Sequence, residues 1–80
     1  MEEDFVVNLL RQELESRELR FNDISKTIDK LRNNMAIETR KSAYFTMQHD
    51  KEAYEKIRRE LRGEMSALRQ AIKKLEDNDD

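Results

Sequence analysis

Hydrophobic residues recur at intervals of three and four along the first part of the chain. Between residues 10 and 35, spacings that alternate between 4 and 3 place eight residues on one face of a helix, and only one of them is charged. The eight are Leu10, Leu14, Arg17, Phe21, Ile24, Ile28, Leu31 and Met35. This heptad pattern predicts a first helix over about residues 3–39.

A second apolar stripe follows in the last third of the chain. Its members are Tyr54, Ile57, Leu61, Met65, Leu68, Ile72 and Leu75, and the heptad phase slips once beside Gly63. The pattern predicts a second helix over about residues 43–76, followed by an acidic tail at 77–80 that should fray. Gly63 fits a tolerated surface position best, with a close crossing of two helices as the alternative.

The apolar pattern lapses between the two stripes, because Glu38, Ser42 and Asp50 occupy positions that should be apolar. We therefore expect a turn at about residues 40–42, with Ser42 as the N-cap of the second helix. Asn33-Asn34 offers an alternative helix end. A short β-hairpin formed by residues 37–39 and 44–46 is a further alternative, because these segments contain β-branched and aromatic residues.

A turn at this place brings the two stripes together in one register. Facing residues then have numbers that sum to 85, which pairs Leu10 with Leu75, Leu14 with Ala71, Ile24 with Leu61, Ile28 with Ile57 and Leu31 with Tyr54. The predicted fold is all-α, an antiparallel helical hairpin forming a single domain over residues 1–80. One helix of about 110 Å in a parallel coiled coil is the alternative, because no Pro or Gly lies in the middle segment to force a turn.

The composition supports helices and indicates that the chain binds a second copy or another protein. Half of the 80 residues are Ala, Glu, Lys, Leu or Arg, Gly occurs once and Pro is absent. Only 36% of residues are hydrophobic and 42% are charged, so a large core is excluded. A small chain without disulfides seldom stabilises itself by one narrow seam, so we expect it to self-associate, as a dimer that forms a four-helix bundle, or to pack on a larger assembly.

Apolar residues outside the stripes identify candidate partner contacts at both ends of the rod. They are Phe5, Val6 and Leu9 near the N-terminus, and Ile37, Tyr44, Phe45 and Met47 at the turn. The aromatic residues at the turn could instead fold over the tip of the hairpin and cap its core. Both interpretations remain open from the sequence.

Arg17 is the one charged residue in the first stripe. In the register above, Glu64 lies one helical turn from it across the interface, so the two can form an ion pair that fixes register. Alternatively, Arg17 extends to solvent and only its stem covers the seam.

Residue types suited to catalysis are scarce. The chain has no Cys, one His and no glycine-rich phosphate loop, so we expect no enzyme activity, no small-molecule substrate, no metal and no cofactor. His49, Asp50 and Glu52 lack the ligand spacing of a structural metal site. No apolar run approaches the roughly 20 residues of a membrane span, and the N-terminus is acidic, so an intracellular, soluble protein is expected.

Nucleic-acid binding is the remaining chemical alternative. The net charge of −2 gives no attractive field for phosphates, but Arg58, Arg62, Arg69 and Lys73 form a basic stripe on the second helix. The same stripe could instead lie against Glu15, Glu18 and Asp29. We therefore expect a structural or assembly subunit, a scaffold or adaptor, with a helical regulator that occupies a host protein's groove, or a nucleic-acid binder, as alternatives.

Overall fold

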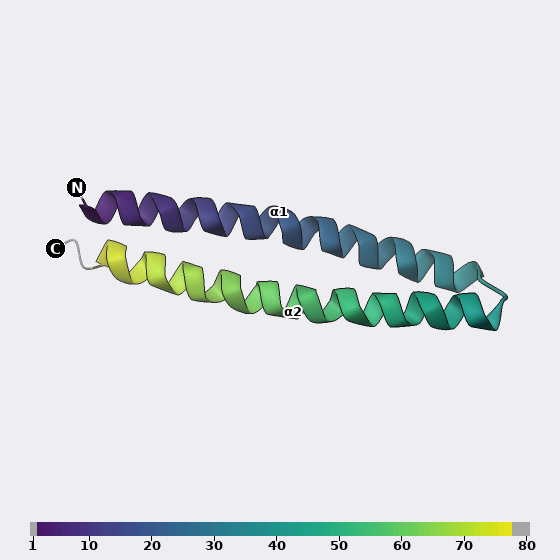
Figure 1. Cartoon of the computed structure of the whole chain (residues 1–80). Coiled ribbons are helices and arrows are strands. Elements are labelled where there is room, and N and C mark those ends of the chain that lie inside the picture. The colour runs from purple at the N-terminus through teal and green to yellow at the C-terminus, as the bar shows by residue number, and fades with distance from the viewer. Residues whose placement is uncertain (1, 78–80) are drawn as a thin grey trace.

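Two long helices, packed antiparallel, make up the molecule (Figure 1). The computed structural model describes residues 2–77, with side chains from residue 5. Helix α1 spans Glu2–Ile37, helix α2 spans Lys41–Asp77, and together they form a rod of 61 × 14 × 13 Å. The all-α hairpin is therefore confirmed, and the single 110 Å helix is wrong. Of the acidic tail, Asp77 ends α2 and residues 78–80 lie outside the described part.

The core is a single seam between the helices, as the heptad pattern predicts. Ile24, Ile28 and Leu61 form a buried cluster, and Phe21 and Ile57 pack against it. The predicted register places Ile24 against Leu61 and Ile28 against Ile57, and all four belong to this group. Ile28 has no exposed surface and Leu61 only 3%.

Other positions of the two stripes are buried to different degrees. Met65 and Ile72 are buried, whereas Tyr54 is 36% exposed. Half-buried positions are Leu10, Leu14, Arg17, Phe21, Leu31, Met35, Ile57, Leu68 and Leu75. Val7 is buried as well and was not expected, although it lies three residues before Leu10 and continues the 3/4 spacing backwards.

The turn occupies residues 38–40, two residues earlier than expected. The carbonyl of Arg40 accepts the first hydrogen bond of α2, from the amide of Tyr44 at 2.9 Å, so Arg40 and not Ser42 is the N-cap. One Glu38 carboxylate oxygen accepts from both the backbone N–H and the Nε of Arg40, each at 3.0 Å. This local clamp closes the turn. The segments of the proposed β-hairpin are instead helix and turn.

Gly63 lies on an open surface of α2. A Cβ added there would meet no heavy atom within 4 Å, apart from the helix's own nearby backbone. The interpretation as a tolerated surface glycine is confirmed, and the close helix crossing is wrong. The slip in heptad phase is absorbed without a special backbone feature at this residue.

Candidate functional site

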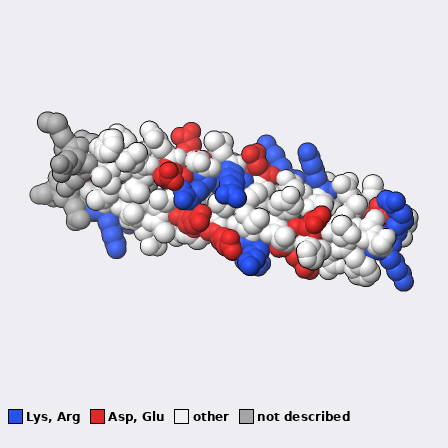
Figure 2. Space-filling model, viewed as in Figure 1, with Lys and Arg blue, Asp and Glu red and all other residues white. Residues whose placement is uncertain are grey.

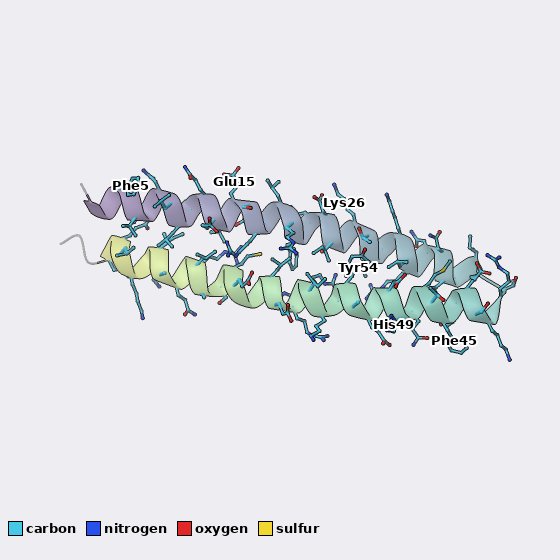
Figure 3. All side chains as sticks on the ribbon, in the orientation of Figure 1. Phe5, Glu15, Lys26, Phe45, His49 and Tyr54 are labelled. Carbon is cyan, nitrogen blue, oxygen red and sulfur yellow. The ribbon has the colours of Figure 1, made fainter. Side chains whose placement is uncertain are left out.

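Exposed apolar side chains gather at the turn. Ile37 is 80% exposed, Phe45 62% and Tyr44 37%, whereas Met47 is half-buried. The rings of Tyr44 and Phe45 meet edge to face with centroids 6.0 Å apart. Phe45 points away from α1 (Figure 3), so its ring does not cover the end of the core. The interpretation as a cap over the tip is therefore wrong for Phe45.

A second apolar surface lies on α1, near the N-terminal end. Phe5 is 66% exposed, and Val6 and Leu9 are also exposed beside the buried Val7. Phe5 stands on the side of α1 that faces away from α2 (Figure 3). Leu19, which the sequence analysis did not single out, is 61% exposed. Phe5, Gln12 and Leu19 are seven residues apart and therefore lie on one face of α1. This spacing in the sequence could have identified Leu19 as exposed.

The half of the hairpin next to the turn has no fully buried side chain. None of residues 29–60, all of which the structure describes, is buried. Polar residues occupy protected positions there: Lys51 Nζ and Glu55 Oε1 lie 3.4 Å apart, and both side chains are about three-quarters covered. The Lys51–Glu55 pair lies within α2 and does not join the helices, so the seam near the tip is held by partly buried side chains.

The predicted ion pair between Arg17 and Glu64 forms across the two helices. Arg17 Nε donates to Glu64 Oε2 at 3.2 Å, and its Nη1 donates to Glu13 Oε2 at 2.6 Å. The hydrogen bond to Glu13, and then that to Glu64, raise the pKa of the Arg17 guanidinium. Arg17 thus joins both helices and stays charged, while its stem lies half-buried in the seam.

Two further ion pairs join the helices, and their members are seven residues apart on each helix. Arg11 pairs with Glu76 near the open end, and Arg69 Nη2 lies 3.5 Å from Glu18 Oε1. Exposed pairs of this kind add little stability, but opposite charges at matched positions disfavour other registers.

The basic stripe of α2 is partly engaged within the molecule. Arg69 pairs with Glu18, and the guanidinium of Arg62 lies 5.6 Å from the centroid of the Phe21 ring, a cation–π contact. Arg58 is half-buried and Lys73 is exposed. On the face shown in Figure 2, basic and acidic side chains alternate and do not form a continuous basic strip.

Among the carboxylates of residues 5–77, which the structure describes, Glu38 in the turn has a clearly lowered pKa. The side-chain hydrogen bond from Arg40, followed by the bond from the Arg40 backbone N–H, lowers the pKa of Glu38 below its ordinary 4.5. The same pair raises the pKa of Arg40. The Glu38 side chain is only 14% exposed, so this clamp is sheltered although it lies at the tip.

The described side chains offer little that could hold a ligand. Among them, no three His, Cys, Asp or Glu side chains lie close enough to share a metal ion. A shallow hollow of 260 Å³ on α2 is lined by Glu52, Glu55 and Arg59. Neither helix, over its described length, is apolar enough to cross a membrane.

Comparison with known proteins adds no relative. The chain matches no protein-family model, no curated protein and no solved structure.

Proposed function

We propose that the hairpin is a non-enzymatic assembly module, a scaffold or adaptor that works by binding other protein chains through its exposed apolar surfaces. The observation that carries this proposal is the area left in contact with solvent. The chain exposes 6428 Å², whereas a compact monomer of 9.7 kDa exposes about 5,100 Å². The difference of about 1,300 Å² follows from the 61 × 14 × 13 Å rod shape, which leaves the outer faces of both helices uncovered.

The tip of the hairpin is the surface for a different protein. Ile37, Tyr44 and Phe45 are exposed together, at the end of a half that lacks a buried core. Aromatic side chains are enriched in the buried centre of protein interfaces. The adjacent Arg40 and Lys41 add positive charge, which suits a partner with acidic residues around an apolar groove.

The experiment compares binding by tip variants. Phe45→Ser and Ile37→Ser should keep the helical circular dichroism spectrum of the parent, because both side chains are exposed. With a photo-cross-linking group at residue 44, the parent should capture other proteins in cells, and both variants should lose this capture. Leu19→Ser is the matched control, since it removes an equally exposed apolar side chain far from the tip. Equal cross-linking by all three variants would contradict the proposal.

Nucleic-acid binding receives less support. Arg62 and Arg69 of the basic stripe already contact Phe21 and Glu18, so binding to phosphates must compete with these contacts. A mobility shift with duplex DNA and with RNA at about 50 and 200 mM salt tests this alternative. A shift at 50 mM salt that Arg58→Ala abolishes would favour it over the assembly module.

A further inference from the structure

Charge is distributed unevenly along the rod. Residues 30–49 surround the turn and reach about 12 Å along each helix. They contain only one of the chain's 18 acidic residues, Glu38, but four basic residues, so their net charge is +3. The other sixty residues hold twelve basic and seventeen acidic residues, a net charge of −5. We call residues 30–49 the basic tip.

The single carboxylate of the basic tip is sheltered, whereas its four cations are exposed. Glu38 Oε1 accepts from Arg40 Nε at 3.0 Å, and its side chain is only 14% exposed. Among the side chains that the structure describes, no carboxylate lies within ion-pair distance of Lys30, Arg32 or Lys41. Basic side chains project at this end of the rod, on the right in Figure 2. The exposed apolar side chains of the turn are therefore surrounded by positive charge.

We propose that the basic tip binds an acidic protein segment, which presents Asp or Glu side chains around an apolar hollow, and that the rod stands end-on against it. This inference rests on the proposed function and names the chemistry of the partner at the same surface. Ile37, Tyr44 and Phe45 enter the hollow, and the Lys and Arg side chains face the carboxylates. An apolar centre inside a polar rim is the usual anatomy of a protein interface.

The charge of the rest of the molecule decides the orientation. An acidic surface attracts the basic tip and repels the other sixty residues, so contact along the side of the rod is unfavourable. The end of a rod 14 × 13 Å wide offers little area compared with the roughly 800 Å² that each partner contributes to a standard interface. The complex should therefore be weak, short-lived and sensitive to salt.

An anionic lipid surface fits the basic tip less well than a protein does. Recognition of such lipids uses clusters of about four to eight Lys or Arg residues. The basic tip has three beyond the Arg40–Glu38 pair. A folded partner can also be complementary in shape to the edge-to-face rings of Tyr44 and Phe45.

Reversal of one charge tests the inference. Lys41→Glu changes an exposed residue in the first turn of α2, where an acidic side chain suits the helix dipole, so the fold should be retained. With the photo-cross-linking group at residue 44, this variant should capture at least about tenfold less protein in cells than the parent. Lys26→Glu is the matched control, because it makes the same charge change at an exposed position of α1 outside the basic tip. It should capture as much as the parent.

The cross-linked peptides report the chemistry of the partner directly. Mass spectrometry should place them in partner segments with a net negative charge. Binding of such a segment, made as a synthetic peptide, should weaken at least about fivefold between about 50 and 300 mM salt. Neutral or basic segments, or equal capture by Lys41→Glu and the parent, would overturn the inference.

The same variants separate this inference from the proposed function. Loss of capture in Phe45→Ser but not in Lys41→Glu would leave the proposed function standing and remove the acidic partner. A parent that captures no protein would contradict both. Flotation of the parent with vesicles of phosphatidylcholine and phosphatidylserine in equal parts, if Lys41→Glu abolishes it, would assign the basic tip to anionic lipid and overturn the inference.

Discussion

The two halves of the hairpin share one geometry but differ in their cores. In the half away from the turn, formed by residues 5–28 and 61–77, six apolar side chains are buried. In the half next to the turn, residues 29–60, none is. We call these the core half and the tip half. The contrast shows that continuous helices do not guarantee a continuous core.

The difference comes from what α2 presents to α1. In the core half it presents Leu61, Met65 and Ile72, which fill the seam. In the tip half it places Lys51 and Glu55 in protected positions, so Leu31 and Met35 are only half-buried. We therefore expect stability to be concentrated in the core half, and the tip half leaves more apolar surface exposed near the turn.

The strongest test of this contrast is a pair of core truncations. Ile28→Ala removes the most buried side chain and should cost about 2–5 kcal/mol, close to the whole stability of a small domain. Met35→Ala, in the tip half, should cost less than half as much. Urea unfolding followed by circular dichroism measures both, and equal losses would remove the distinction between the halves.

Hydrogen exchange should show the same contrast without mutation. Amides of residues 29–60 should exchange at least about tenfold faster than those of residues 61–72, because local opening there exposes little apolar surface. Exchange resolved by NMR at neutral pH gives the comparison. Uniform protection along α2 would show that the tip half opens only together with the core half.

Gly63→Ala should stabilise the core half. The added methyl group meets open space, and replacing glycine in a helix interior should raise the free energy of unfolding by about 1 kcal/mol. Ala67→Gly, at an exposed position one turn later, is the control and should lower it by a similar amount. A loss of stability in Gly63→Ala would contradict the open environment described for this residue.

The smallest effect concerns the clamp in the turn. The pKa of Glu38 is lowered in the folded chain, so the stability it contributes is complete above its ordinary pKa of 4.5 and is lost as pH falls through the lowered value. Between pH 6 and pH 3 the parent should lose slightly more stability than Glu38→Gln, which cannot titrate. Thermal midpoints at the two pH values measure the difference, and parallel decreases in both proteins would show that the clamp adds nothing.

Much of this architecture could be predicted from the residue pattern. The 3/4 spacing predicts both helices, and the register that pairs Ile24 with Leu61 follows from matching two stripes around one turn. The Arg17–Glu64 pair follows from the same register. These features follow from the periodic spacing of apolar side chains, which the sequence itself shows.

Other features depended on the folded arrangement. The turn begins at Glu38 because its carboxylate binds Arg40, a local contact that competes with an equally plausible cap at Ser42. Ile28 is fully buried and Met35 only half-buried, although both belong to the first stripe, because the packing of α2 decides how much of each position is covered. Periodicity along one chain locates helices and their faces. How much of each face a neighbour covers is a property of two surfaces in contact, and only the tertiary structure determines it.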